Sequence, residues 1–224
     1  MIKDYSRLAE IVSLAEESEV TVDVGCDHGF VTEYLLRNNI AKKVIATDIS
    51  EKCLNKTKQL LQKKNLSARA EFVVADGLVG INSSDIDQII IAGMGGSTII
   101  KILNEMPLNC QKARLILQPM NDIRELRIVL NKLGFKILRD KVIADGNKYY
   151  HIMTAINDLQ KLNDIQIDCG VNTEDYRSDD YQAWLDFTIK KLKNISKDMP
   201  NENPRKKKFL KGIAELSSLK MKGE

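Results

Sequence analysis

The sequence predicts an α/β fold with a mostly parallel, doubly wound sheet, a terminal antiparallel hairpin and a C-terminal α-helical hairpin. Three observations lead to this prediction. Short β-branched runs alternate with amphipathic segments of roughly ten to fifteen residues up to residue 134. Two further strand-like runs follow, separated only by an Asp-Gly-Asn turn. After residue 157 only helical patterns remain.

The predicted elements follow this alternation in order. Strands are predicted at residues 21–24, 44–49, 72–75, 86–92, 114–117, 135–143 and 149–156. Helices are predicted at residues 8–15, 30–38, 50–65, 97–106 and 121–134. Ser50 and Asn121 are the expected N-caps of two of these helices, and Gly134 is expected to end the last one. In an open parallel sheet the ligand binds at the carboxyl ends of the strands.

The region after residue 157 is predicted to form a separate helical unit. A polar linker leads to a helix that Ser178 can cap, with an apolar face of Tyr181, Trp184, Leu185, Leu192 and Ile195. A second amphipathic helix has an apolar face of Phe209, Leu210, Ile213, Leu216 and Leu219. We expect the two helices to pack as an antiparallel hairpin. The predicted domains are therefore residues 1–156 and 157–224.

Charge is distributed unevenly along the chain. The 224 residues carry a net charge of only +3, and 43% of them are apolar, which is enough to bury a core. From residue 181 to the end, however, eleven Lys or Arg face five Asp or Glu, so this region has a net charge of +6 and the rest has −3. A basic tail on a mildly acidic body indicates a polyanionic partner.

Counting residues excludes several classes of protein. The four cysteines are far apart and form no CxxC pair, which disfavours a zinc ribbon or a disulfide scaffold and fits a reducing cytosol. Two histidines are too few for most zinc hydrolases, so no metal is expected. No apolar run has the length of a signal peptide or a membrane span. We therefore expect a cytoplasmic protein that has no membrane partner.

The first predicted strand ends in a D-x-G-x-x-x-G turn, from Asp23 through Gly25 to Gly29. Glycine lets the backbone turn sharply and approach a ligand, and a carboxylate at a strand end can bind a cationic or hydroxyl-bearing group. The spacing differs from the dinucleotide motif G-x-G-x-x-G. A plain strand-to-helix turn explains this stretch equally well.

Aspartate also ends the next two predicted strands. Asp48 lies 23 residues after Gly25, close to the offset at which an acid meets ribose hydroxyls in nucleotide-binding sheets. Asp76 precedes Gly77, where its carboxylate could accept a hydrogen bond from an adenine amino group. Taken singly, Asp48 could help Ser50 to cap a helix and Asp76 could form an ordinary turn. Taken together with Asp23, the two predict an adenosine-bearing ligand across the sheet edge.

The fourth predicted strand ends in a glycine-rich turn, Gly93-Met94-Gly95-Gly96. The backbone of this turn is expected to line the ligand pocket, although glycine needed only for helix packing is the alternative. A NAD-type dehydrogenase could use such a turn, but no acid for the ribose follows about 20 residues later. Gln118 at the fifth strand end either faces a substrate or is a turn residue.

These motifs together resemble those of the bacterial tRNA (adenine-22)-N1-methyltransferases. The resemblance rests on residues 23–29, on residues 91–96 and on Leu117-Gln118-Pro119, and it extends from the N-terminal helix through the helical tail. It implies a Rossmann-like class I methyltransferase sheet of seven strands that binds S-adenosylmethionine. The chain departs from the family at Cys26, where a small hydroxyl residue is frequent, and at Met120, where asparagine is frequent.

The resemblance also implies roles for the site residues. Cofactor-binding residues would be Asp23, Gly25, Gly29, Asp48, Ile49, Asp76, Gly77 and Gly93. The target base would approach Asp27, His28 and Met94, next to Gly95 and Gln118. Adenine N1 already has a lone pair, so the protein must mainly align it with the methyl donor and exclude water. Because N1 lies on the Watson–Crick edge, the base must first be unpaired or extruded.

The basic tail is the predicted tRNA contact. Four cations begin the last helix, where the macrodipole is already positive, so phosphates would stabilise them. The residues of this contact are Lys190, Lys191, Arg205, Lys206, Lys207 and Lys208. A solvated face compensated by Glu202 is the alternative. His28 could orient the base or only hold its own loop, and His151 is expected to be structural.

Two other functions fit parts of the pattern. A small-molecule methyltransferase would share the pocket but would have no use for the basic tail. A non-catalytic RNA-binding module would use the tail but would not bind S-adenosylmethionine, and the three strand-end aspartates argue against it. For the oligomeric state, a monomer is favoured.

Overall fold

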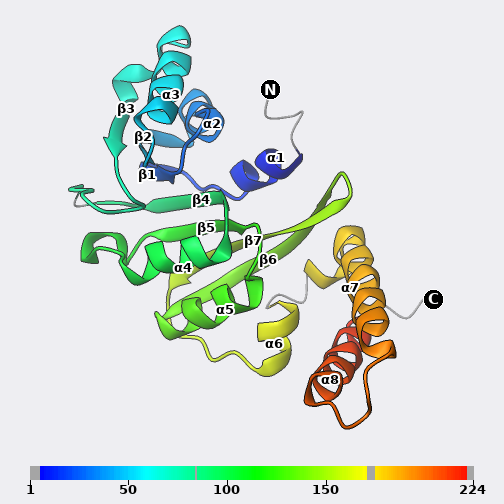
Figure 1. Cartoon of the computed structure of the whole chain (residues 1–224). Coiled ribbons are helices and arrows are strands. Elements are labelled where there is room, and N and C mark those ends of the chain that lie inside the picture. The colour runs from blue at the N-terminus through cyan, green and yellow to red at the C-terminus, as the bar shows by residue number, and fades with distance from the viewer. Residues whose placement is uncertain (1–5, 84, 171–174, 221–224) are drawn as a thin grey trace.

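A mixed seven-stranded sheet forms the centre of the molecule in the computed structural model, which describes residues 6–83, 85–170 and 175–220 (Figure 1). The strands are β1 (Ser18–Val24), β2 (Ala41–Asp48), β3 (Ala70–Val74), β4 (Gln88–Met94), β5 (Arg114–Pro119), β6 (Phe135–Asp145) and β7 (Lys148–Asn157). They lie in the order β3-β2-β1-β4-β5-β7-β6. The first five pair in parallel, and β7 pairs antiparallel with both β5 and β6. The predicted fold class is confirmed.

Helices connect the parallel strands and form the C-terminal region. They are α1 (Ser6–Ser13), α2 (Phe30–Arg37), α3 (Glu51–Lys63), α4 (Gly96–Asn104), α5 (Ile123–Lys132), α6 (Asp164–Cys169), α7 (Asp179–Lys197) and α8 (Pro204–Ser218). Among the described residues, short 3-10 helices are η2 (Ser67–Arg69), η3 (Leu108–Cys110) and η4 (Asp175–Arg177). None of the helices in the described part of the chain has both the length and the apolar character needed to cross a bilayer.

Alternate side chains of the central strands point to opposite faces of the sheet, and each face carries its own core. Ile89 and Ile91 of β4 pack with the helices α4 and α5, whereas Ile90 packs with α1, α2 and α3. In β5, Leu115 likewise packs on the face covered by α4 and α5, and Ile116 packs on the opposite face. The continuous apolar runs in the sequence follow from this burial on both faces.

The register of the parallel strands brings their carboxyl ends to one edge of the sheet. Val24 at the end of β1 is level with Thr47 of β2 and with Ile91 of β4. Asp48 is level with Val74 of β3. The residues that follow these positions therefore converge on one edge, although they are far apart in the sequence.

Asn121 does not cap the helix that it was predicted to cap. The helix α5 begins at Ile123, and its N-cap is Asp122, which has a left-handed φ of 52° and makes no capping hydrogen bond through its side chain. Asn121 instead accepts a hydrogen bond, through Oδ1, from the backbone N–H of Gly96 at the start of α4 (2.8 Å). A side chain on Gly96 would meet Asn121 O at 2.3 Å. Asn121 therefore joins the loop after β5 to the start of α4 and does not cap α5.

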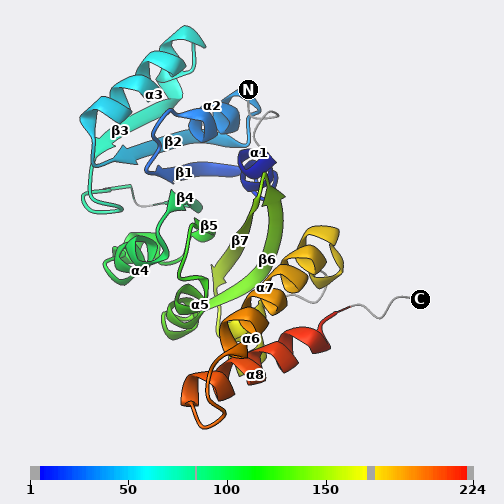
Figure 2. The same cartoon turned by 45° about the vertical axis from the view of Figure 1, so that its right-hand side comes forward.

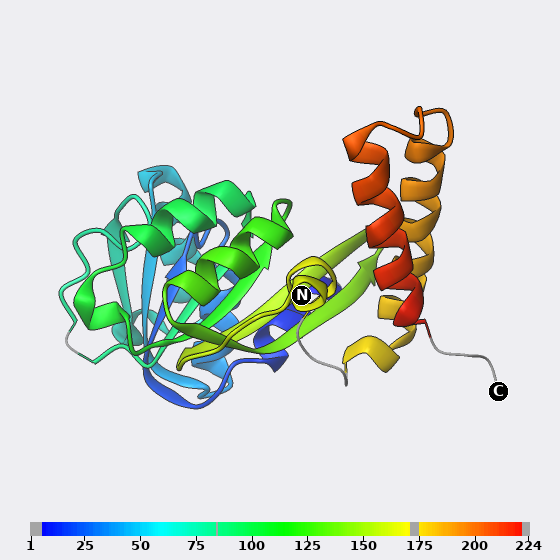
Figure 3. The ribbon, with the colours of Figure 1, turned by 90° about the horizontal axis from the view of Figure 1, so that it is seen from below.

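The C-terminal helices α7 and α8 lie side by side as a hairpin, as predicted, and the loop of residues 198–203 joins them (Figures 2 and 3). Ser178 caps α7 by accepting a hydrogen bond from Tyr181 N at 3.2 Å. The predicted apolar faces are wrong at two positions, because Ile195 and Leu210 are exposed. The helix α7 packs against both α8 and Val142 of β6. Because of this packing, Ile189 is buried, although it was not part of the predicted apolar face. The short helix α6 was not predicted.

A buried ion cluster joins the sheet to these helices. Arg127 of α5 donates to Asp140 of β6 (2.7 Å) and to the carbonyl of Ile167 in α6 (2.9 Å). His151 of β7 lies 3.1 Å from Asp140 and packs edge-on against Trp184 of α7. Burial alone would raise the pKa of Asp140, but the Arg127 charge and the His151 contact outweigh burial and lower this pKa. Burial lowers the pKa of His151.

We expect Arg127→Met to reduce the free energy of unfolding by about 3–5 kcal/mol, because it leaves the Asp140 carboxylate buried without its partner. Urea denaturation measures this reduction. As a control, Lys136→Met breaks the exposed ion pair with Asp158 and should change stability little. Equal reductions in the two variants would show that the buried cluster stabilises the fold no more than an exposed ion pair does.

Candidate active site

A cavity of about 700 Å³ opens at the carboxyl ends of β1, β2 and β4. Seven of the predicted site residues line it: Asp23, Gly25, Asp27, His28, Asp48, Gly93 and Met94. They come from three strands that are separate in the sequence and adjacent in the sheet. The register of the sheet therefore assembles the predicted motifs into one site.

The turn after β1 depends on two glycines. Gly25 has a φ of +72°, and the backbone N–H groups of Gly25 and Cys26 donate to the carbonyl of Thr47 at 2.8 and 3.1 Å. Gly29 has a φ of +73°, and a Cβ there would lie 2.5 Å from the Thr57 side chain. Both positions favour glycine because L side chains rarely adopt these conformations. The turn thus lies across the end of β2, next to the cavity.

Asp23 is a buried carboxylate at the cavity, with only 4% of its surface exposed. Thr32 Oγ1 donates to it at 2.6 Å. Burial raises the pKa of Asp23 from 3.8 to about 6, and no basic side chain is among the causes. A buried carboxylate that lacks a cation is stabilised by a cationic ligand.

Asp27 and His28 form a pair at the rim of the cavity. Asp27 Oδ2 lies 2.7 Å from His28 Nδ1, and both side chains are more than half exposed. Asp27 has a left-handed φ of 42°. The His28 ring is nearly parallel to the ring of Phe30, with centroids 5.8 Å apart. The rim therefore offers a carboxylate and two aromatic rings to an incoming planar group.

Asp48 both lines the cavity and stabilises the local backbone. Its Oδ1 accepts a hydrogen bond from Ser50 N at 2.8 Å, and its Oδ2 accepts one from Asp27 N at 3.4 Å. Ser50 in turn caps α3, as predicted. The two interpretations offered by the sequence are compatible, since a carboxylate has lone pairs enough for backbone donors and a ligand. Ile49, the next residue, is 75% exposed and offers apolar surface beside this carboxylate.

Asp76 and Gly77 lie outside the residues that line the cavity. Asp76 forms an exposed ion pair with Lys101 of α4 at 2.6 Å. The carbonyl of Gly77 accepts a hydrogen bond from Thr47 Oγ1 at 3.1 Å, and a Cβ on Gly77 would lie 2.7 Å from Ile102. Any ligand that approaches Asp76 would have to share this carboxylate with Lys101.

The turn after β4 faces the turn after β1. Gly93 has a φ of +77°, and Met94 continues the strand through an irregular register to pair with Pro119. The Met94 side chain lies over Gly25, where its Cε would be 2.1 Å from any Cβ. Gly95 follows as the N-cap of α4. Only glycine at position 25 lets the two turns approach this closely.

Gln118, which was predicted either to face a substrate or to be a turn residue, is fully buried instead. Its Oε1 accepts hydrogen bonds from Gly93 N (3.1 Å) and from Arg7 Nη1 (2.9 Å), and its Nε2 donates to the carbonyl of Pro119 (2.8 Å). These hydrogen bonds occupy both ends of its amide group, so Gln118 stabilises the Gly93 turn from its buried side.

The sequence did not point to four further residues that line the cavity. These are Arg7, Leu8, Phe30 and Val31. Arg7 and Leu8 belong to α1 and reach the cavity because α1 packs against α2 and β6. Arg7 contacts Gln118 across a separation of 111 residues. No local motif signals such a contact.

Of the side chains predicted to contact tRNA, most are exposed, and one forms hydrogen bonds within the protein. Lys190, Lys191, Lys207 and Lys208 are exposed. Lys206 instead donates to the carbonyl of Met199 and to Asn201, and so closes the turn between α7 and α8.

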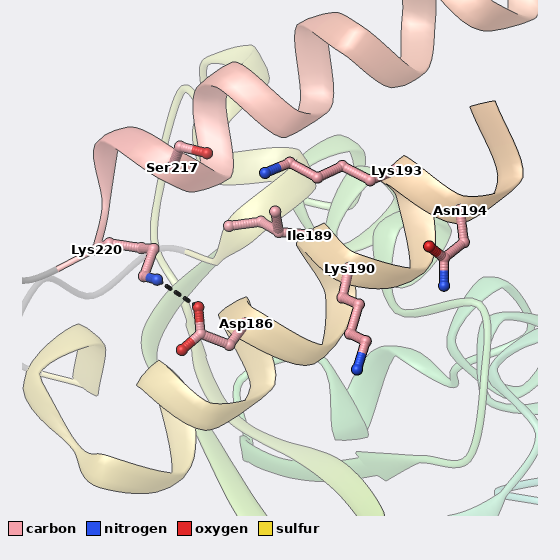
Figure 4. Close-up of a pocket in the computed structure, with 7 residues that line it drawn as sticks. All are labelled: Asp186, Ile189, Lys190, Lys193, Asn194, Ser217 and Lys220. Atoms are coloured by element: carbon pink, nitrogen blue, oxygen red, sulfur yellow. Dashed lines mark ion pairs between the residues drawn. The ribbon is translucent and has the colours of Figure 1, made fainter. Parts of the chain in front are cut away.

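A groove of about 410 Å³ lies between α7 and α8 (Figure 4). Lys193 reaches across the groove toward Ser217, whereas Lys190 points away from it. Lys220 is paired with Asp186. The lysines of this groove therefore do not converge on one point, and they form a basic surface rather than a closed site.

Comparison with known proteins places the chain in a family. The profile of the methyltransferase domain family matches residues 5–153, and the chain belongs to that family. It is 29% identical over 155 residues to the tRNA (adenine(22)-N(1))-methyltransferase of Bacillus subtilis, an alignment that spans 69% of this chain and 65% of that enzyme. It is also 29% identical over 163 residues, or 72% of each chain, to a candidate tRNA methyltransferase of Mycoplasma genitalium.

Solved structures extend the similarity to the tail. A candidate tRNA (m1A22) methyltransferase of Streptococcus pneumoniae is 25% identical and superposes with a TM-score of 0.89 over 96% of this chain and 98% of that one. A structure of that protein in complex with S-adenosyl-L-methionine gives a TM-score of 0.86 over 98% and 99% of the two chains. Within the described part of the present chain, no group of three or more His, Cys, Asp or Glu is arranged to hold a metal ion.

We expect Asp23→Asn to raise the free energy of unfolding at pH 8 by up to about 3 kcal/mol. This estimate multiplies the rise in the pKa of Asp23 on folding by about 1.4 kcal/mol per pKa unit. The pKa of Asp23 rises on folding, so its ionisation destabilises the native state increasingly as the pH rises from about 4 to about 6. Urea denaturation at pH 4 and pH 8 should show the gain only at pH 8. The exposed Asp198→Asn should show no such difference, and an equal gain for Asp23→Asn at both pH values would refute the assigned cause.

Proposed function

We propose that this chain transfers a methyl group from S-adenosylmethionine to N1 of the adenine at position 22 of tRNA. One observation carries the proposal: residues from three strand ends, identified by their resemblance to such enzymes, converge on a single cavity. The Bacillus subtilis relative, which bears this activity in its name, and the similarity to Streptococcus pneumoniae structures along nearly the whole chain support it.

The cavity suits the cofactor in size and in charge. Its volume of about 700 Å³ lies within the range of small-molecule sites. Asp23 offers a buried carboxylate to the ammonium group of the methionine, and Asp48 offers carboxylate oxygens to the ribose hydroxyls. The exposed side chains of Ile49 and Val74 supply apolar surface for the adenine ring beside them. When bound, S-adenosylmethionine supplies an electrophilic methyl group, and its transfer to N1 leaves the target base positively charged.

The rim of the cavity suits the acceptor base. The rings of His28 and Phe30 provide a surface for a planar base. The Asp27 carboxylate, held beside His28 and fixed by a backbone hydrogen bond to Asp48, stabilises positive charge on that base. Met94 and Gly95, on the opposing turn, limit the depth that the base reaches and help to exclude water.

The tail provides the contact with the rest of the tRNA. Arg205 and Lys207 lie in the first turn of α8, where the helix dipole adds to their charge, and Lys208 follows them. Lys190 and Lys191 extend the basic surface along α7. Lys206 contributes by holding the turn. In this proposal residues 1–156 bind the cofactor, residues 157–224 bind tRNA, and the protein acts as a monomer in the cytoplasm, where its substrate is found.

The proposal is tested by incubating the protein with labelled S-adenosylmethionine and unmodified tRNA and then analysing the nucleosides. We expect N1-methyladenosine at position 22 and none in a tRNA whose position 22 is not adenine. Label in another nucleoside, or transfer only to small acceptors, would contradict the proposed function. Binding of tRNA without any transfer would favour a non-catalytic module.

We expect replacement of Lys190, Lys191, Lys207 and Lys208 by Gln to flatten the salt dependence of tRNA binding. The slope of log K against log salt should fall by about 0.7–0.9 for each phosphate that is no longer neutralised. Filter binding over a range of salt concentrations measures the slope. Lys42→Gln with Lys43→Gln, at the opposite end of the sheet, is the matched control. An unchanged slope in the fourfold variant would show that the tail does not bind phosphates.

A further inference from the structure

The hairpin of β6 and β7 extends beyond the carboxyl edge of the parallel strands. The register between β5 and β7 ends where Leu117 is level with Met153, whereas β6 and β7 stay paired as far as Asp145 and Lys148. Residues 143–150, called the hairpin arm below, therefore project on the side of the sheet where the cavity opens (Figure 1).

The two faces of the hairpin arm contact different parts of the molecule. On one face, Tyr150 packs with the core next to α1, and its ring centroid lies 5.4 Å from the guanidinium carbon of Arg7, a residue of the cavity lining. On the other face, Tyr149 contacts Phe187 of α7, with ring centroids 5.5 Å apart. The hairpin arm therefore lies between the rim of the cavity and α7, with a tyrosine on each face.

Phe187 is an aromatic side chain that the fold leaves open to solvent. It is 53% exposed, and every other Phe, Tyr or Trp within the described ranges is buried or half-buried. Its contact with the half-buried Tyr149 is tilted, with an interplanar angle of 45°. A single exposed apolar side chain is common on protein surfaces. Phe187 differs from such a side chain in its rigid support and in the charges beside it.

The contact between the two rings is fixed by the packing of the hairpin arm on α7. Ala144 is level with Tyr149 across the hairpin, and its backbone N–H donates to Asp180 Oδ2 of α7 at 3.0 Å. Val142, at the base of the arm, packs into the buried cluster that α7 shares with α8. The two rings are therefore held in position before any ligand binds, which lowers the entropic cost of binding.

Two cations lie beside the exposed ring. Lys190 and Lys191 follow Phe187 by three and four positions, so they lie on the same side of α7. Both are exposed, neither forms an ion pair with a described residue, and Lys190 points away from the groove between α7 and α8 (Figure 4). The neighbouring carboxylate of Asp186 is neutralised by Lys220. An exposed ring flanked by free cations is typical of surfaces that bind single-stranded nucleic acid, where rings stack on bases and cations bind phosphates.

We propose that Phe187 and Tyr149 form a stacking platform for an unpaired base of the tRNA, while Lys190 and Lys191 bind the phosphates beside it. This inference rests on the proposed function, because it takes tRNA as the ligand. The target adenine must leave its base pair before N1 can be methylated, and its departure removes stacking from the neighbouring bases. The platform stacks on such a base at one face of the hairpin arm while the target enters the cavity beside the other face.

The test is filter binding of the full-length protein to unmodified tRNA and to a fully paired RNA duplex of similar length, over a range of salt concentrations. We expect Phe187→Ala to weaken tRNA binding by about 5- to 100-fold, the usual effect of removing an aromatic ring that stacks on a base. Because stacking neutralises no phosphate, the slope of log K against log salt should remain that of wild type. Binding of the duplex, which has no unpaired base, should change by less than about 2-fold.

Leu210→Ala is the matched control, because Leu210 is exposed to the same extent, 52%, on the other helix of the tail. It should change tRNA affinity by less than about 2-fold. Phe187→Trp should retain the affinity and Phe187→Leu should not, since only the former keeps a ring that can stack.

Full tRNA affinity in Phe187→Leu, or equal losses for tRNA and duplex in Phe187→Ala, would overturn the proposal. Unchanged tRNA affinity in Phe187→Ala would also overturn it, and a loss of self-association in sedimentation of that variant would then assign the two rings to a contact between two copies of the chain. If the wild-type protein binds no tRNA, the proposed function itself fails.

Discussion

The parallel pairing of β1 with β2 and β4 is the constraint on which the rest of the site depends. Pairing sets Val24, Thr47 and Ile91 side by side, so the chain emerges from three strands at one edge of the sheet. The N–H groups of Gly25 and Cys26 then bond to the carbonyl of Thr47, which places the first turn across the end of the second strand. The carboxylates of Asp23 and Asp48 meet at the cavity as a result.

The site contains features that lower the stability of the ligand-free protein. Asp23 is buried with no cationic partner among the described residues, and Asp27 is a non-glycine residue with a positive φ. Elsewhere the buried charges are compensated, as the contacts of Asp140 with Arg127 and His151 show. Uncompensated charge is thus found at the cavity, where a ligand can supply the missing partner.

Local chemistry determines some features of this fold, and packing between distant segments determines others. The strand ends and the caps at Ser50 and Ser178 could be predicted, because β-branched runs and hydroxyl caps act within a few residues. Asn121, Gln118 and Arg7 could not, because their partners lie 25 to 111 residues away. The wrong inward assignment of Ile195 and Leu210 has a similar origin: helical periodicity defines a face, but the packing of α7 against both α8 and β6 decides which part of it is buried.

We propose that a single cavity at this edge of the sheet receives the methyl donor, with the methionine end at Asp23. A crystal structure of the protein grown with S-adenosylhomocysteine tests it most directly. We expect the ligand in the cavity of about 700 Å³, with its ammonium at Asp23 and its ribose at Asp48. A ligand bound elsewhere, or in this cavity with its methionine end away from β1, would contradict it.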